Sequence, residues 1–326
     1  MDFLPARFEI HGATLGLAWF LVVNVAATVA VSLAAHRMTA STRARTAAVW
    51  FALRMFPAAA AITFVVAVFL PSYWLYEPRE TTEGFDLTLT VGAVVSLAAL
   101  LAAAIRGVSA WRSASWRIRA WMRTARPLAL AGTDLPAFEI DTDAPVLALV
   151  GVLRPRLLAT RGLIDALTPE ELSAAVAHEI GHSRAWDNLK RLAVRSAPDV
   201  LPPTGAIRAL ERRWASSAEH HADHLASDHD PRARCALASA LLKVARLFPP
   251  PAPTSEPISV LVGGGDIASR VRRLLDDRAA ITASARAARP LYWLATLALG
   301  PGAVITYGPL LHAIHETTEL VVRSLP

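Results

Sequence analysis

Residues 168–188 read TPEELSAAVAHEIGHSRAWDN, and this stretch decides how the whole chain can be interpreted. It begins as a helix should, because Thr168 can cap the first turn and Pro169 suits the first helical position. Glu171 stands where a capping box requires a glutamate, and apolar residues then recur at helical spacing. We therefore predict a helix that starts at Pro169 and carries the polar residues that follow.

His178 and His182 are four residues apart in this helix, so both imidazoles project from one face and can bind one metal ion. In His-Glu-x-x-His sites the glutamate, here Glu179, is the general base that activates the attacking water. Gly181 weakens the helix, and its small size is expected to let a neighbouring helix or the substrate approach. The pattern predicts a zinc site with Glu179 as the catalytic residue. The alternative is an amphipathic helix with two solvated histidines.

A catalytic zinc ion needs a third protein ligand and one open position. The stretch AEHHADHLASD, residues 218–228, lies in a second predicted helix over 205–228. Glu219 and Asp223 share one face of this helix. We predict Glu219 as the third ligand and Asp223 as the residue that orients a ligand imidazole. Three histidines of the same helix stay open as rivals for the third ligand: His220, His221 and His224.

Apolar residues are concentrated in a few long runs of the sequence. Hydrophobic residues make up 54% of the 326 residues and charged residues only 18%, whereas soluble domains have about 25% charged residues. Runs of this length predict membrane spans. We expect about four spans: 13–35, 47–70, 87–105 and 291–314. Arg54 falls in the second run, and its long side chain is expected to reach the nearer interface.

The charges near the ends of these runs predict the orientation, because basic residues favour the cytosolic side of a membrane. Arginines follow the first and third runs and precede the fourth: Arg37, Arg43 and Arg45; Arg106, Arg112, Arg117, Arg119, Arg123 and Arg126; Arg286 and Arg289. The loop after the second run, residues 72–86, is mainly acidic. We therefore predict a multi-pass protein of the cell membrane, with its N-terminus outside and its large middle region in the cytosol.

Residues 107–126 mix arginines with Trp111, Trp116 and Trp121. This mixture suits a helix that lies on an anionic membrane surface, so we expect it to contact the lipid bilayer. Basic residues interleaved with aromatic ones can also bind nucleic acid, and the net charge is +6. Beside a predicted span we favour lipid and expect no nucleic-acid partner. The single cysteine, Cys235, excludes an intrachain disulfide and is expected to be a buried helix residue.

The stretch GVLRPRLLATRGLIDALTPEELSAAVAHEIGHSRAWDNLKR, residues 151–191, resembles the integral-membrane antirepressor metallopeptidases of the beta-lactam-sensor type. More distantly, it is similar to the CAAX-prenyl-protease and heat-shock membrane protease families. The shared features are the Leu-Arg-Pro-Arg of 153–156, the Arg-Gly-Leu of 161–163 and Asp187. These families take their third ligand from a Glu-x-x-x-Asp pattern, which Glu219 and Asp223 match.

The resemblance implies a cytosolic gluzincin-like domain in which two zinc-ligand helices lie beside a small β-sheet. An edge strand of this sheet would hold an extended substrate, and residues 145–150 and 156–160 are the candidate strands. Residues 263–277 look like the helix that follows the ligand helix, and Arg270 or Arg273 is a candidate donor to the oxyanion. The outer segments are too short for a penicillin-binding sensor domain, so sensing of beta-lactams is not expected.

The expected fold is therefore a mainly α membrane protein with about four transmembrane helices and a cytosolic zinc peptidase domain that contains a small β-sheet. Its segments are three spans over 1–106, a basic interfacial segment over 107–126, the peptidase domain over 127–289, and a fourth span with a short outer tail over 290–326. The expected function is a zinc-dependent endopeptidase that cleaves a cytosolic or membrane-proximal protein, such as a repressor-like regulator. A homodimer or a sensor protein is a candidate partner. The alternative is a non-catalytic signalling or scaffold protein that keeps the zinc-site helix.

Overall fold

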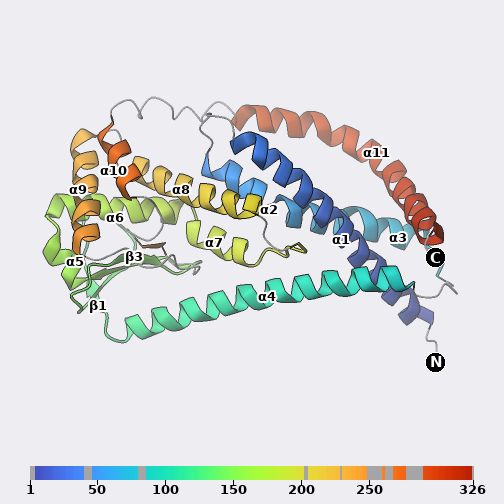
Figure 1. The fold of residues 1–326 in the computed structure, drawn as a ribbon, viewed down its shortest axis with the longest axis horizontal. Coiled ribbons are helices and arrows are strands. Elements are labelled where there is room, and N and C mark those ends of the chain that lie inside the picture. The colour runs from blue at the N-terminus through green and yellow to red at the C-terminus, as the bar shows by residue number, and fades with distance from the viewer. Residues whose placement is uncertain are drawn as a thin grey trace.

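Long helices and one small sheet make up the computed structural model, which describes residues 4–39, 46–79, 86–201, 205–227, 230–247, 259–260, 267–276 and 289–324. For residues 4–6, 39, 259–260 and 289–305 it describes the backbone alone. The sheet lies at one end of the molecule, and the N- and C-termini lie near the other end (Figure 1).

The apolar runs form the helices α1 (Leu4–Thr39), α2 (Ala47–Phe64), α3 (Leu70–Tyr76) and α4 (Leu87–Met122), with a short π-helix, η1 (Val65–Phe69), between α2 and α3. Three segments are long and apolar enough to cross a membrane: Arg7–Met38, Ala47–Tyr76 and Leu87–Met122. They correspond to the first three predicted spans. The fourth predicted span lies within α11 (Arg289–Ser324), where the side chains of residues 289–305 are outside the described part, and it stays a prediction.

Helix α4 continues without interruption through most of the segment that was expected to be a separate interfacial helix. It has 36 residues, which corresponds to roughly 54 Å at 1.5 Å per residue. In its second half Ala114 is buried against the sheet, whereas Trp111 and Trp116 are exposed. The segment thus connects the third span directly to the sheet, and contact of its tryptophans with lipid remains a prediction.

The sheet has five strands in the order β1-β2-β4-β3-β5. The strands are β1 (Arg126–Leu128), β2 (Ala137–Ile140), β3 (Leu147–Val150), β4 (Arg156–Thr160) and β5 (Ser259–Val260). Strands β2 and β4 are parallel, and the other neighbours are antiparallel. The two candidate strands of the sequence analysis correspond to β3 and β4. Strand β4 is interior, and β5 pairs with β3 at Ala148 and Leu149, so the chain itself covers part of the edge expected to hold substrate.

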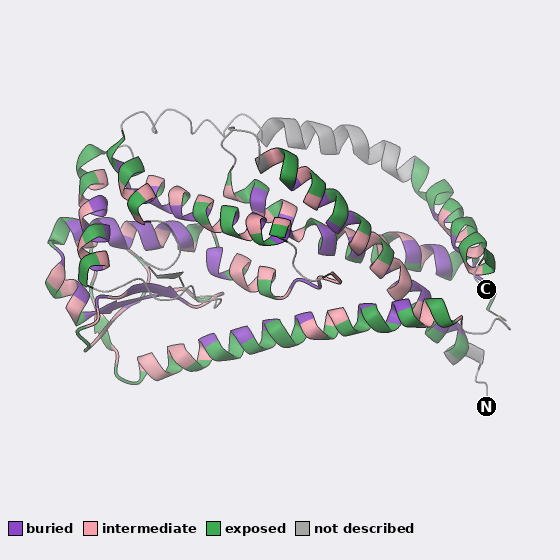
Figure 2. Ribbon diagram, in the orientation of Figure 1, coloured by how far each residue is buried: buried purple, intermediate pink, exposed green. Residues whose placement is uncertain are grey.

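Both faces of the sheet are covered, which explains why β3 is an uninterrupted apolar run. The remaining helices are α5 (Arg161–Ala166), α6 (Pro169–Arg184), α7 (Asp187–Arg195), α8 (Gly205–Ser227), α9 (Pro231–Leu247) and α10 (Ile267–Leu275). On one face Leu147, Leu149 and Leu157 pack in the core formed with α6 and α9. On the other face Ala148, Val150 and Leu158 pack against the end of α4. Figure 2 shows this buried zone along the sheet and α6.

Arg54 does not reach the lipid interface as expected. It is buried, with its Nη2 atom 2.6 Å from Asp199 Oδ2 and its Nε atom 2.7 Å from Glu211 Oε1. The reason is that α2 packs along α8, whose residue Glu211 provides a protein partner where a charge in hydrocarbon would be costly. Asn24 of α1 similarly donates to the carbonyl oxygen of Pro198, at 3.2 Å. The first two spans therefore hold the segment that leads into α8.

Two further expectations meet the structure differently. Cys235 is exposed on α9, not buried, because the core of that helix is made by residues on another face, such as Leu237 and Leu241. Several residues behind the predicted orientation and domain boundaries lie outside the described residues: Arg43, Arg45, Glu80, Glu83, Arg286 and most of 249–266. The orientation in the membrane accordingly stays a prediction.

Candidate metal centre

Helix α6 begins as its sequence predicts. The Thr168 hydroxyl accepts from the Glu171 N–H, and the Glu171 carboxylate accepts from the Thr168 N–H at 2.8 Å, which completes the capping box. The same carboxylate accepts from the Ser239 hydroxyl at 2.6 Å and pairs with Lys243 at 2.7 Å. The start of the helix is thus fixed to α9, which sets the direction in which α6 enters the core.

Gly181 lets α6 and α8 approach closely, as expected from its size. A Cβ atom placed there would lie 3.0 Å from the Cα atom and 3.2 Å from the Cβ atom of Ala222. These distances are shorter than an alanine would tolerate without a shift of one helix. The close approach places the ligand-bearing turn of α6 opposite Glu219 and Asp223, one turn apart on α8.

The polar face of α6 meets that of α8 in one buried cluster. His178, His182 and Glu219 each offer one donor atom, and these atoms all lie within 4.8 Å of one another. The two Nε2 atoms are 3.2 Å apart, and the carboxylate oxygens of Glu219 lie 3.6 Å from His178 Nε2 and 3.5 Å from His182 Nε2. The histidines are fully buried and Glu219 is 2% exposed. We call this group the inner cluster; it could bind a metal ion.

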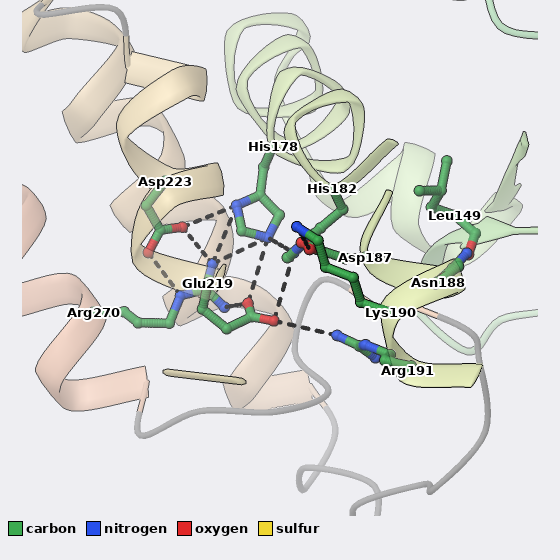
Figure 3. A network of polar contacts seen from close by, with 10 residues as sticks. All are labelled: Leu149, His178, His182, Asp187, Asn188, Lys190, Arg191, Glu219, Asp223 and Arg270. Carbon is green, nitrogen blue, oxygen red and sulfur yellow. Dashed lines mark hydrogen bonds and ion pairs between the residues drawn. The ribbon is translucent and has the colours of Figure 1, made fainter. Parts of the chain in front are cut away.

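Each histidine of the inner cluster is held from behind by a carboxylate (Figure 3). His178 Nδ1 lies 2.9 Å from Asp223 Oδ1, and His182 Nδ1 lies 2.7 Å from Asp187 Oδ2. A carboxylate on Nδ1 fixes the ring and leaves Nε2 as the ligand atom. Both Nε2 atoms therefore point toward Glu219.

Asp187 reaches His182 because the chain reverses sharply after α6. Trp186 has a φ of 56°, in the left-handed region that a bulky residue rarely adopts. This turn starts α7 and brings Asp187 and Asn188 back toward the sheet. The side-chain amide of Asn188 donates to the carbonyl oxygens of Leu149 and Gly151 at 3.0 and 3.1 Å. Asn188 thereby fixes α7 against the end of β3.

Arg270 of α10 balances the negative charge of the cluster. It is 2% exposed, forms a bidentate pair with Asp223 at 2.5 and 2.9 Å, and lies 3.0 Å from Glu219 Oε2. Arg191 approaches Glu219 Oε1 from the other side, at 3.7 Å. Because the guanidinium of Arg270 is engaged by these carboxylates, its role in this structure is to hold α8 in place.

These contacts shift the pKa values of the ionisable groups in the cluster. Burial by itself would lower the pKa of His182, but the carboxylates of Glu219 and Asp187 raise it to about 10. Burial would raise the pKa of Asp223, but His178 and Arg270 lower it to about 2. The pKa of Glu219 is also far below its ordinary value, because the histidines and Arg270 outweigh its burial. A metal ion must therefore displace protons from the imidazoles when it binds.

Glu179 differs from the other carboxylates of the site. It is fully buried, and neither of its oxygens has a hydrogen-bond partner among the described residues. Burial raises its pKa above the ordinary value, although the nearby histidines oppose this. A buried carboxylate without a partner is costly, so its presence beside the two histidines calls for a functional explanation.

Comparison with protein families supports a metallopeptidase. Residues 114–227 match peptidase family M48. The matched region runs from the end of α4 through strands β1 to β4 to the end of α8, and it includes every residue of the inner cluster. No curated protein sequence matches the chain. Together with the three apolar helices, the family match supports a membrane-type zinc metallopeptidase, while the beta-lactam-sensor subtype stays a proposal.

The structure brings together the predicted residues His178, Glu179, His182, Glu219 and Asp223, and it leaves the rival ligands outside the inner cluster. Among the described residues, Arg273 donates to His220 at 2.9 Å at the surface. The sequence reasoning noted Asp187 as a shared feature without assigning its contact with His182. It also considered Arg270 only as a donor to the oxyanion. A lone acid five residues after the second histidine was the available signal for Asp187.

A cleft of about 240 Å³ opens beside His182. Its apolar lining comes from the end of β3, from the turn that follows, from the turn after α6 and from the start of α7: Leu149, Val152, Pro155, Trp186 and Leu189. Trp186 is about half exposed at its rim. The cleft thus reaches one residue of the inner cluster, His182, beside the end of β3.

Proposed function

We propose that this protein is a membrane-bound zinc-dependent endopeptidase that hydrolyses peptide bonds of a cytosolic or membrane-proximal protein. The sequence resemblance favours a regulatory, repressor-like substrate. The observation that carries the proposal is Glu179: a fully buried, unpartnered carboxylate beside two imidazoles whose Nε2 atoms converge. A scaffold protein would gain nothing from keeping this carboxylate uncompensated.

The residues of the inner cluster fit a zinc ion. Two imidazole nitrogens and one carboxylate are a ligand set typical of catalytic zinc sites, which keep one position open for water or substrate. Asp223 and Asp187 contact the Nδ1 atoms of the two histidines, and zinc-binding histidines usually have such a partner. His178, His182 and Glu219 would hold the ion. Bound zinc would polarise the scissile carbonyl and lower the pKa of the attacking water.

The protein residues then carry the proton transfers. Glu179 accepts the proton of the attacking water on a carboxylate oxygen and passes it to the leaving amide nitrogen. Its raised pKa favours the transfer, because the carboxylate becomes a stronger base for the proton of the water. Asp187 and Asp223 keep the imidazoles in place while the charge near them changes.

The cleft indicates where the substrate would lie. Its apolar lining favours an apolar side chain near the cleaved bond. Strand β5 pairs with β3 at Ala148 and Leu149, and the Asn188 amide bonds the next edge carbonyl oxygens, so an extended substrate would take the place of β5 on β3. Recognition through the backbone would leave the remaining side chains of the substrate free to vary.

Replacing Glu179 with glutamine tests the proposal. The amide keeps the shape of the side chain but cannot accept the proton, so cleavage of fluorescently labelled casein by the detergent-purified chain should fall about 10²- to 10⁴-fold. Zinc content measured by mass spectrometry should stay unchanged. Glu170→Gln, in the exposed first turn of the same helix, is the matched control and should keep full activity. Undiminished cleavage by Glu179→Gln would exclude Glu179 as the base, and an inactive, zinc-free wild type would favour the scaffold alternative.

A further inference from the structure

A second group of metal-binding side chains lies at the end of the molecule far from the sheet. Glu77, His315 and Glu319 offer donor atoms that all lie within 4.8 Å of one another. Glu77 follows the last residue of α3, whereas His315 and Glu319 are one turn apart on α11. Figure 1 places α3 and the end of α11 near the chain termini, far from α6. We call this group the outer cluster.

The helices that carry the outer cluster are docked firmly against each other. The Ser72 hydroxyl of α3 donates to the carbonyl oxygen of Leu311 at 2.6 Å, in a buried position. The Tyr307 hydroxyl donates to the carbonyl oxygen of Ala67 at 2.5 Å, and Trp19 Nε1 donates to the Thr318 hydroxyl at 3.1 Å. These bonds fix the position of α11 relative to α1, η1 and α3, and thereby place His315 beside Glu77.

Glu77 lies at the C-terminal end of α3. It is 9% exposed, and its N–H bonds the carbonyl oxygen of Tyr73 at the C-terminal end of α3. The C-terminal end of a helix carries partial negative charge, which disfavours a carboxylate there. Glu319 adds a second carboxylate, and His315 Nδ1 lies 3.7 Å from Glu77 Oε2. Two carboxylates and one imidazole converge at a place that favours positive charge.

We propose that Glu77, His315 and Glu319 form a second metal site, which binds a divalent transition-metal ion of the Zn²⁺ type. Imidazole nitrogen with carboxylate oxygen is a ligand set that suits zinc and its neighbours better than Mg²⁺ or Ca²⁺, which prefer oxygen ligands alone. The ion would join the end of the second predicted span to α11. In the predicted orientation this site faces the outside, so it would respond to external metal, whereas the inner cluster faces the cytosol.

The competing arrangement is a set of ion pairs without metal. In it a protonated His315 pairs with Glu77, and Arg323 pairs with Glu319 at 3.1 Å. Arg323 is 75% exposed, so this pair is solvated and contributes little stability. The two arrangements predict opposite responses to zinc, which makes them separable by experiment.

The test measures zinc bound per chain in the full-length, detergent-purified protein, equilibrated at a buffered free Zn²⁺ concentration. We expect His315→Ala and Glu319→Gln each to lose one zinc relative to the wild type. His312→Ala is the matched control, because His312 lies one turn earlier on α11, contacts Tyr76 and pairs with Glu316 outside the outer cluster. It should keep the wild-type zinc content. Thermal unfolding provides a second readout: added Zn²⁺ should raise the Tm of His182→Ala, and this rise should vanish in His182→Ala/His315→Ala.

The proposal would be overturned if zinc content and the Zn²⁺-dependent rise in Tm were the same in His315→Ala, Glu319→Gln and the wild type. The ion pairs would then explain the outer cluster. The result is also separable from the proposed function. Zinc that is lost in His315→Ala but retained in His182→Ala would support the outer cluster, even if the inner cluster bound none. Loss in His182→Ala alone would support only the inner cluster.

Discussion

The inner and outer clusters use the same elementary device but differ in how firmly it is held. Each takes two ligands one turn apart on one helix; the third ligand comes from another helix in the inner cluster and from the residue after α3 in the outer cluster. In the inner cluster, both histidines are fully buried and each Nδ1 atom meets a carboxylate. In the outer cluster, the side chains of His315 and Glu319 are 18% and 25% exposed.

This difference shows what separates a prepared site from a convergence of ligands. The spacing of the ligands is similar, whereas the inner cluster has a second imidazole where the outer cluster has a second carboxylate. Burial strengthens electrostatic interactions, and the carboxylates of Asp187 and Asp223 fix the imidazole rings of the inner cluster. The side chains of the inner cluster are ordered when the protein folds, whereas those of the outer cluster would become ordered when the ion binds.

Metal removal gives the largest expected effect. A carboxylate that holds a ligand histidine raises the affinity for the metal about 10- to 100-fold. The inner cluster has two, Asp223 and Asp187, so we expect it to bind zinc roughly 10²- to 10⁴-fold more tightly than the outer cluster. A series of chelators of increasing strength should strip the outer zinc well before the inner zinc. Zinc content and casein cleavage, followed together, should show full activity after the first loss. Simultaneous loss of both ions would contradict the comparison.

Replacing Asp187 with asparagine should reduce the difference in zinc affinity between the inner and outer clusters. The amide keeps the size of the side chain but removes the charge that faces His182 Nδ1 at 2.7 Å. Zinc affinity of the inner cluster should fall about 10- to 100-fold, measured by competition with a chelator. Asp141→Asn is a control, because Asp141 is exposed and pairs with Arg161 away from the site. An unchanged affinity in Asp187→Asn would mean that burial alone holds the ring.

Helical spacing predicted which residues of the inner cluster share a helix face. The shared faces of His178 with His182 and of Glu219 with Asp223 follow from a period of 3.6 residues, whereas the choice of Glu219 over its histidine neighbours rested on the family resemblance. Asp187 escaped this reasoning, since it reaches His182 only through the reversed backbone at Trp186.

Contacts between distant parts of the sequence could not be predicted from one chain. The partners of Arg54 and Arg270, and the meeting of Glu77 with His315, depend on which helices pack together. Tertiary packing also explains why α4 passes through the expected interfacial segment without a break, because its end is needed to cover the sheet. Local sequence patterns report on single elements, and they carry little information on such pairings.

The smallest expected effect concerns Glu171, which anchors the start of α6, the helix that carries the two histidines of the inner cluster. Glu171→Gln should weaken the bonds to Lys243, Ser239 and the Thr168 N–H and cost about 1–3 kcal/mol of stability at neutral pH. Glu170→Gln, in the exposed neighbouring position, should cost far less.

The pH dependence of this effect has a definite sign. Burial would raise the pKa of Glu171, but the bonds from Lys243, Ser239 and Thr168 outweigh it and lower the pKa below its ordinary value. The unfolded chain therefore binds the proton first, so the contribution of Glu171 is complete above about pH 4.3 and disappears as the pH falls through the lower folded value. Thermal unfolding of Glu171→Gln and wild type should differ most at pH 7 and converge in acid. A difference that stayed constant down to low pH would mean that the charge of Glu171 does not stabilise α6, and that packing alone fixes the helix.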